Sequence, residues 1–210
     1  MSEGKKPAES PEYVRVSTAA DIALGFKRGL FFRRAYPLCI NLLLYYEDGC
    51  KANCLYCGQA RGICESAICK TLIRVKWPLR KLSDVIDRFR EKFLSEGSFL
   101  RPYRICVATI TNGRAREGLI QVVRKVWEEL RVPVSALITP TLFPDEEHLK
   151  EIRDVGAERI GIAIDCATPR LFELLRGRKA RGPHLWETYI RGVKRAVKVM
   201  GKGKVGIHII

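Results

Sequence analysis

Short apolar runs alternate with amphipathic segments along most of this chain. The runs are rich in Val, Ile and Leu and nearly continuous, which is typical of strands buried on both faces of a sheet. They cover residues 39–46, 103–110, 133–138, 159–164 and 204–210. Between them, apolar residues recur at the i, i+3, i+4, i+7 spacing of a helix with one buried face. These helices are predicted over residues 82–93, 119–130, 145–155, 168–176 and 184–200.

This alternation predicts an α/β fold, because buried strands that alternate with helices form a parallel sheet with the helices packed outside it. We place this core in residues 39–210 and an amino-terminal tail and helix in residues 1–38. The chain stops within its last apolar run. We therefore expect a further strand to come from additional sequence or from a partner, and the active unit to be larger than this chain.

The amino-terminal part carries weaker signals. Residues 1–12 are polar and charged, which predicts a disordered tail. Ser17 or Thr18 can cap a helix that runs to about Arg34, before a proline. Residues 71–75 are predicted to be a short extended segment.

Length and composition indicate one globular domain. A chain of 210 residues with 47% hydrophobic residues can bury a full core. No apolar run reaches the ~20 residues of a membrane-spanning helix, and the polar start is not typical of a signal peptide. Eight cysteines without a secretory signal indicate a reducing compartment, where thiols serve metals or chemistry. We therefore expect a cytoplasmic protein that does not insert into membranes.

The charge balance is strongly basic. Lys and Arg number 38 against 23 Asp and Glu, a formal net charge of +15. This favours acidic partners such as nucleic acid, anionic cofactors or an acidic protein. The cations are scattered over the predicted helices rather than gathered in one block, so a solvated, charge-rich surface is the alternative.

Three thiols lie close together directly after the first predicted strand. Cys50, Cys54 and Cys57 follow the turn signal Asp48-Gly49, so they lie on a loop at the carboxyl end of a buried strand. That edge is where α/β barrels place their chemistry. A structural zinc needs four ligands, and with Cys64 as the fourth these thiols could form a zinc-bound structural knot in a protein that is not an enzyme. A four-iron cluster held by three thiolates instead leaves one iron open to a small molecule.

The gaps of three and then two residues, with Tyr56 before the third cysteine and Gly58 after it, resemble the signature of the radical S-adenosylmethionine superfamily. The resemblance implies a [4Fe-4S] cluster on Cys50, Cys54 and Cys57, with S-adenosylmethionine bound at the open iron and near Tyr56 and Gly58. It also implies an open (β/α)6-type partial TIM barrel. About five of its parallel strands are predicted here, so the barrel is expected to be incomplete in this chain.

The ends of two other predicted strands nominate cofactor contacts. Thr111 and Asn112 follow the second strand, at the edge where the superfamily often carries a glycine-glycine-glutamate motif. That motif is absent, so a polar turn with Gly113 is the alternative. Asp165 follows the fourth strand, in a segment similar to one of biotin synthase that lies near the cofactor ribose and the substrate. This resemblance makes Asp165 a cofactor-binding and catalytic candidate, with a helix cap as the alternative.

The other candidates are one histidine and the remaining cysteines. His208 is expected to point inward from the fifth strand, as a cofactor contact or as a core histidine. Cys64 and Cys69, with Cys39, are candidate ligands of a second iron–sulfur cluster. Buried free thiols are the alternative for Cys39 and for Cys106.

Several longer segments resemble the biotin synthase and lipoyl synthase branch of the superfamily. They include Gly-Ile-Ala-Ile-Asp-Cys-Ala-Thr-Pro over residues 161–169 and Gly-Lys-Val-Gly-Ile-His-Ile-Ile over residues 203–210. The resemblance extends to biotin synthase-like archaeal proteins, one type of which is a subunit of a two-protein lipoyl synthase. It implies a 5′-deoxyadenosyl radical, sulfur insertion into a protein-bound octanoyl chain, and three partners. These are an acidic lipoyl domain or carrier protein, a partner subunit and an electron donor such as ferredoxin. A biotin synthase-like enzyme and a tRNA-modifying radical enzyme are the alternatives.

Overall fold

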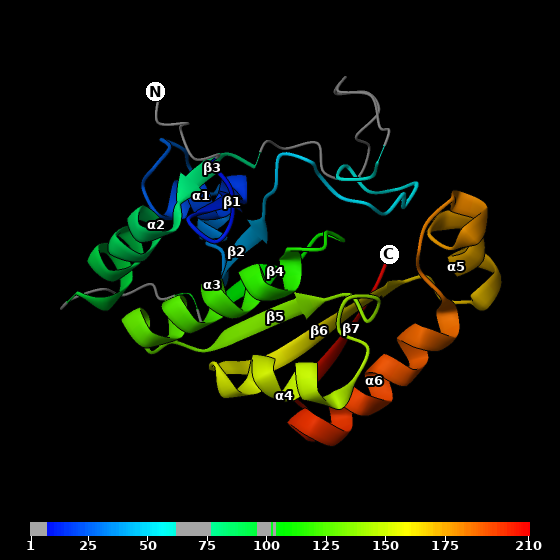
Figure 1. Cartoon of the computed structure of the whole chain (residues 1–210). Helices are drawn as coiled ribbons and strands as arrows, with labels where there is room; N and C mark the ends of the chain where they lie inside the picture. The colour runs from blue at the N-terminus through cyan, green and yellow to red at the C-terminus, as the bar shows by residue number, and fades with distance from the viewer. Residues whose placement is uncertain (1–7, 62–76, 96–101, 103) are drawn as a thin grey trace, which may run out of the picture.

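The computed structural model describes residues 8–61, 77–95, 102 and 104–210. Its strands form one mixed sheet of seven strands in the order β3-β1-β2-β4-β5-β6-β7 (Figure 1). The strands are β1 Tyr13–Val16, β2 Cys39–Leu44, β3 Leu79–Lys81, β4 Arg104–Ala108, β5 Val134–Ile138, β6 Ala157–Asp165 and β7 Val205–Ile209. The predicted segment 71–75 lies outside the described residues.

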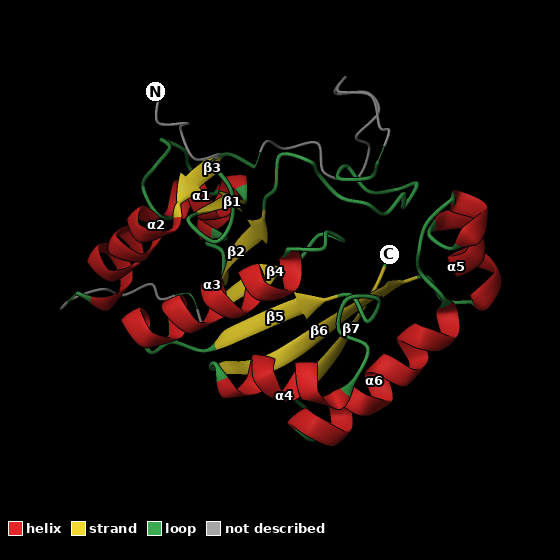
Figure 2. Ribbon diagram, viewed as in Figure 1, coloured by secondary structure: helices red, strands yellow, loops and turns green. Residues whose placement is uncertain are grey.

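Helices follow the parallel strands in sequence and pack along one face of the sheet, with α3, α4 and α6 side by side (Figure 2). The helices are α1 Thr18–Ala23, α2 Leu82–Phe89, α3 Ala115–Leu130, α4 Glu146–Asp154, α5 Pro169–Leu175 and α6 Trp186–Met200. A π-helical turn, Arg90–Leu94, continues α2, and the 3₁₀ helices are Phe32–Arg34 and Arg178–Ala180. Among the described residues, no helix is long and apolar enough to cross a membrane.

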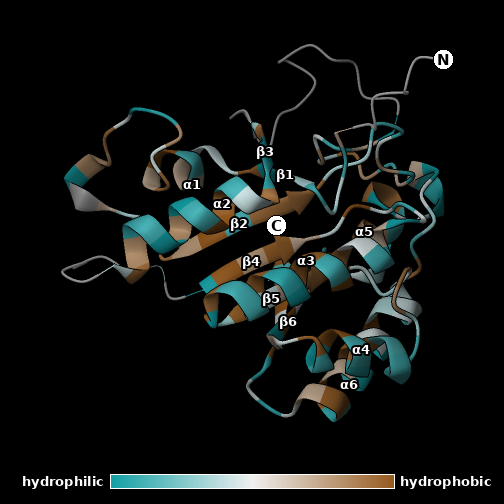
Figure 3. Ribbon diagram, turned by 60° about the vertical axis from the view of Figure 1, so that its left-hand side comes forward, coloured by the Kyte–Doolittle hydropathy of each residue, from teal (hydrophilic) through white to brown (hydrophobic). Residues whose placement is uncertain are grey.

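The parallel core confirms the predicted α/β fold, an open partial barrel. The pairs β2–β4, β4–β5, β5–β6 and β6–β7 are all parallel. On β4, Ile105 and Val107 are fully buried, while Cys106 between them lines a cavity of about 290 Å³. The strands β2 and β4 are coloured hydrophobic in Figure 3, whereas the helices alternate between hydrophobic and hydrophilic residues. Because parallel strands share one direction, all their carboxyl ends meet at one edge of the sheet.

The amino-terminal prediction is wrong in two respects. Residues 8–12, expected in a tail, are ordered against the sheet, where Ser10 is 8% exposed and its N–H donates to the Tyr45 carbonyl at 2.9 Å. The strand β1 that follows pairs antiparallel with both β2 and β3. The helix expected to reach Arg34 ends at Ala23, because Gly25 has a left-handed φ of +76°.

Tyr46 joins the end of β2 to α3. Its side chain is 2% exposed, and its hydroxyl donates to the Arg114 carbonyl at 3.1 Å, just before α3 begins. Gly118 faces this ring, and a Cβ there would overlap the hydroxyl oxygen and lie 3.4 Å from Cζ. The glycine therefore lets the helix approach the strand end from which the cysteine loop departs.

We predict that Gly118→Ala lowers the free energy of unfolding by about 1–3 kcal/mol, because overpacking a rigid core outweighs the better helix propensity of alanine. Urea denaturation measures this. Gly113→Ala is the matched control, since a Cβ there has no heavy atom within 4 Å. In a Tyr46→Phe background the cost of Gly118→Ala should shrink, and an equal cost in both backgrounds would contradict the contact.

Candidate functional site

The cysteine loop, residues 47–61, begins at the carboxyl edge of the sheet and crosses it. Gly49, with a φ of +66°, forms the turn after β2, and its N–H donates to the Tyr46 carbonyl at 3.0 Å. Further along, the N–H of Lys51 donates to Thr111 after β4 at 2.6 Å, and the N–H of Leu55 donates to Leu175 at the end of α5 at 2.8 Å. Backbone hydrogen bonds therefore hold the loop between the ends of β4 and α5.

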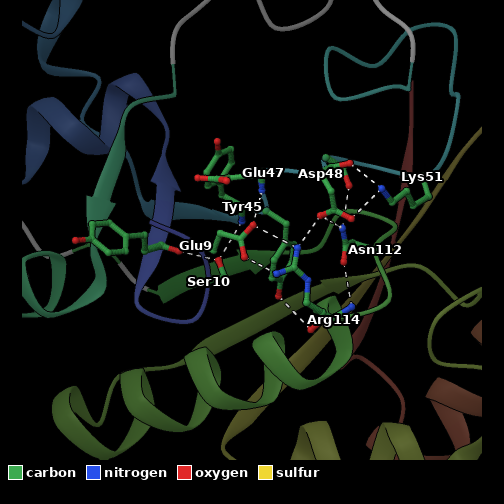
Figure 4. Close-up of polar contacts among 11 residues, drawn as sticks. Glu9, Ser10, Tyr45, Glu47, Asp48, Lys51, Asn112 and Arg114 are labelled. Atoms are coloured by element: carbon green, nitrogen blue, oxygen red, sulfur yellow. Dashed lines mark hydrogen bonds and ion pairs between the residues drawn. The ribbon is translucent and has the colours of Figure 1, made fainter. Parts of the chain in front are cut away.

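A polar cluster fixes the start of this loop, and Figure 4 shows Glu9, Lys51 and Asn112 around Asp48 and Arg114. Asp48 accepts from Arg114 Nη2 at 2.7 Å, from Asn112 Nδ2 at 2.9 Å and from Lys51 Nζ at 2.8 Å. Arg114 also pairs with Glu9, with 3.3 Å between Nη2 and Oε1. The bonds from Lys51, Asn112 and Arg114 hold the pKa of Asp48 far below its usual value. The turn before Cys50 is thereby tied to both β4 and the amino-terminal segment.

The predicted cofactor contacts Thr111 and Asn112 are buried beside the loop. The Asn112 side-chain amide donates to Asp48 and, at 3.0 Å, to the Gly49 carbonyl. The Thr111 N–H points at Cys50, with 3.3 Å between N and Sγ. Both residues therefore hold the loop itself in this structure, and a direct contact with a cofactor stays a prediction.

The three motif thiols occupy a partly buried position at this edge. Cys54 is 7% exposed, and burial raises its pKa to about 11. Burial also raises the pKa of Cys57, and the negative charge of Cys50 would raise it further. Negative charge on Cys50 would thus repel negative charge on Cys54 and Cys57, and a shared cation would relieve this repulsion.

Backbone donors suit these sulfurs to anionic ligation. Besides the Thr111–Cys50 bond, the Gln59 N–H donates to Cys57 Sγ at 3.4 Å. Hydrogen bonds to cysteine sulfurs are a feature of iron–sulfur sites, so the donor set fits a cluster. As the side chains stand, no group of three His, Cys, Asp or Glu within the described ranges is placed to hold a metal ion. Cluster ligation by Cys50, Cys54 and Cys57 stays a prediction from the motif, and Cys64 and Cys69 lie outside the described residues.

The structure brings Asp165 to the cysteine loop. Tyr56 Oη donates to Asp165 Oδ2 at 2.8 Å, and Arg176 Nη1 donates to the same oxygen at 2.7 Å. Asp165 ends β6 with a left-handed φ of +61°, a conformation uncommon outside glycine. Two predicted site residues, Tyr56 and Asp165, are therefore in direct contact.

A buried network behind Asp165 was not predicted from the sequence. Arg176 is 4% exposed, and its Nη2 donates to the Tyr189 hydroxyl at 2.9 Å. That hydroxyl contacts Thr139 and lies 3.1 Å from His184 Nδ1, which is 2.7 Å from Thr141 Oγ1. No signal in the sequence pointed to the buried arginine, which follows the helix α5 as one of many Arg residues.

His208 and Cys39 lie apart from this network. His208 is exposed on β7, pairs in register with Ala163, and lines the 290 Å³ cavity together with Cys39 and Cys106. The neighbouring Cys106 thiol and burial both raise the pKa of Cys39. It begins β2, at the opposite end of the strand from the cysteine loop. A cofactor role for His208 and a second cluster with Cys39 stay predictions.

Comparison with known proteins points to one superfamily. The family model described as "Radical SAM superfamily" matches residues 45–210. No curated protein is similar enough to count as a relative.

Solved structures show the same fold at low identity. A methylornithine synthase (PylB) is 15% identical with a TM-score of 0.51, and the match covers 91% of this chain and 46% of that one. HydG, a maturase of the [FeFe]-hydrogenase, is 16% identical with a TM-score of 0.54, and the match covers 91% of this chain and 39% of that one. The HydG of Carboxydothermus hydrogenoformans is 16% identical with a TM-score of 0.54, and the match covers 91% of this chain and 40% of that one. The chain thus spans less than half the length of these structures.

We predict that acid weakens the fold through His184. Burial, with the nearby charge of Arg176, lowers the pKa of His184 from 6.5 to about 3. Below pH 6.5, His184 binds a proton in the unfolded chain but stays neutral in the folded protein. The free energy of unfolding therefore falls between pH 6.5 and about 3 by up to ~1.4 kcal/mol per pH unit. His184→Asn keeps an acceptor for Thr141 without titrating, so urea denaturation across this range should give a shallower slope. Equal slopes would contradict the prediction.

Proposed function

Because this chain belongs to the radical S-adenosylmethionine superfamily, we propose that it generates a 5′-deoxyadenosyl radical and uses it to insert sulfur into a protein-bound octanoyl chain, as in lipoyl synthesis. Members of the superfamily use a [4Fe-4S] cluster and S-adenosylmethionine. The observation that carries the proposal is the loop of three thiols held at the carboxyl edge of a parallel sheet, in contact with Asp165 through Tyr56.

Cys50, Cys54 and Cys57 would hold the cluster, which supplies the electron that cleaves the sulfonium of the cofactor. The chain's own residues hold the cysteine loop in position. The Asp48 cluster and the Thr111 backbone fix the start of the loop, and the Leu55–Leu175 bond fixes its middle. A loop held in advance spends less binding free energy on ordering when the ligand arrives.

Asp165 is suited to bind the cofactor ribose. Tyr56 and Arg176 both donate to Oδ2, and among the described residues no hydrogen bond reaches Oδ1. The side chain is 11% exposed, so this oxygen sits in a largely dry position where a charge-assisted hydrogen bond is strong. A carboxylate at the end of a parallel strand is a recurrent partner of ribose hydroxyls.

The octanoyl substrate is supported by the resemblance of residues 161–169 and 203–210 to the biotin synthase and lipoyl synthase branch. The net charge of +15 supports an acidic macromolecular carrier, such as a lipoyl domain, and an acidic electron donor such as ferredoxin. The six cysteines that the structure describes are free thiols, which supports a cytoplasmic location. We also propose a partner subunit, as in the two-protein lipoyl synthases.

Replacing Cys50, Cys54 or Cys57 with alanine should reduce bound iron to background and lower 5′-deoxyadenosine formation by more than ~100-fold, since even a residue behind the ligands commonly contributes 10–100-fold. Iron analysis and chromatography after anaerobic purification measure both quantities. Cys106→Ala is the matched control, because it removes a thiol on the same sheet outside the motif, and it should keep iron and cleavage. Zinc in place of iron would support a structural knot instead, and deoxyadenosine at the wild-type level in a motif variant would contradict the assignment.

The substrate is tested by offering an octanoyl-lysine peptide, an octanoylated carrier domain, dethiobiotin and tRNA under reducing anaerobic conditions, with and without the partner subunit. Mass spectrometry should find added sulfur on the octanoyl carrier. The carrier contact should be small, below ~1,200 Å², and its Kd should rise with salt because surface charges are screened over ~8–10 Å. Sulfur on dethiobiotin or tRNA alone would overturn the substrate while leaving the radical chemistry in place.

A further inference from the structure

Arg176 is the buried cation of the candidate site. It caps the carboxyl end of α5, and its guanidinium carbon lies against the rings of Phe172 and Tyr189, 5.2 and 4.7 Å from their centres. The guanidinium is held rather than mobile, because Nη1 and Nη2 are both hydrogen-bonded. Its Nε is buried without a partner among the described residues.

This guanidinium clamps the irregular end of β6. Nη1 donates to the carbonyls of Ala163 and, at 3.1 Å, of Ile164, as well as to Asp165. The register of β6 with β7 shifts between Ala163 and Asp165, and the left-handed φ of Asp165 turns its carboxylate toward Tyr56. Three acceptors from consecutive residues therefore converge on one nitrogen, which fixes the direction of Asp165.

Arg176 lies beside the cysteine motif. The Leu175 carbonyl, one residue before Arg176, accepts from the N–H of Leu55, one residue after Cys54, at 2.8 Å. Asp165 accepts from Arg176 at 2.7 Å and from Tyr56, the residue before Cys57, at 2.8 Å. Within the described residues Asp165 is the single ion-pair partner of Arg176. His184 behind it is held neutral by burial, so the motif thiols have one fixed cation and one fixed anion behind them.

We propose that the Arg176–Asp165 pair sets the reduction potential of the cluster bound by Cys50, Cys54 and Cys57, with Arg176 raising it and Asp165 lowering it. The inference rests on the proposed function. Reduction adds negative charge to the cluster, so a buried cation favours the reduced form and a buried anion opposes it. Both effects are strong at this site because charges out of water are weakly screened, and net charge is one of the factors that set cluster potentials.

The experiment is a potentiometric titration of the reconstituted full chain without cofactor, followed by electron paramagnetic resonance. At a fixed potential, Arg176→Gln should lower the ratio of reduced to oxidised cluster by about tenfold, which is ~59 mV for one electron. Asp165→Asn should raise the ratio, and Arg176→Lys should keep it near the wild-type value. Arg178→Gln is the matched control, since Arg178 is exposed and water screens its charge.

Opposite shifts for the two members of the pair identify electrostatics, because a merely structural role would not reverse its sign. Shifts in the same direction, or none, with a loaded cluster would overturn this inference and leave the proposed function standing. If Arg176→Gln does not fold by circular dichroism, Asp165→Asn decides, and a ratio that fails to rise overturns the proposal. A wild-type chain that binds no iron–sulfur cluster overturns the proposed function and this inference with it.

Discussion

A buried guanidinium must find acceptors on several sides at once, and the site is arranged around that requirement. Arg176 draws the last carbonyls of β6, the Asp165 carboxylate and the Tyr189 hydroxyl to one place. A charge removed from water is tolerated only when it is paired and hydrogen-bonded. The bonds of Nη1 and Nη2 therefore tie the end of β6 to α5 and α6 and hold the Asp165 carboxylate in place.

The cysteine loop is held at the same carboxyl edge of the sheet, by a second set of hydrogen bonds. Its start is tied to β4 and to Glu9 through Asp48, Asn112 and Arg114. Its middle is tied to the end of α5 through the Leu55 N–H. A loop held at its start and its middle by elements that also pack the core carries its thiols on a rigid support, as a reactive site requires.

The fold alone leaves the chemistry open. PylB, a methylornithine synthase, and HydG, a hydrogenase maturase, share this architecture at 15–16% identity. Their activities differ, so the side chains of each site must decide the reaction. In this chain the inner face of the sheet carries the thiols of Cys39 and Cys106 in one cavity with His208. These thiols and this imidazole differ chemically from Arg176 and Asp165 at the carboxyl edge. The cavity and the carboxyl edge therefore offer separate chemistry.

The sequence by itself determined the features that local patterns carry. The five parallel strands followed from apolar runs, the helices between them from the spacing of their apolar residues, and the loop from the spacing of three cysteines. Only the tertiary structure decided the rest. The strands β1 and β3, which end the sheet on one side, are four and three residues long, too short to show a period. The contacts of Tyr56 with Asp165 and of Glu9 with Arg114 join residues 109 and 105 positions apart. Such pairs produce no periodic pattern in one sequence. Their members meet only because the folded sheet brings the carboxyl ends of its strands together.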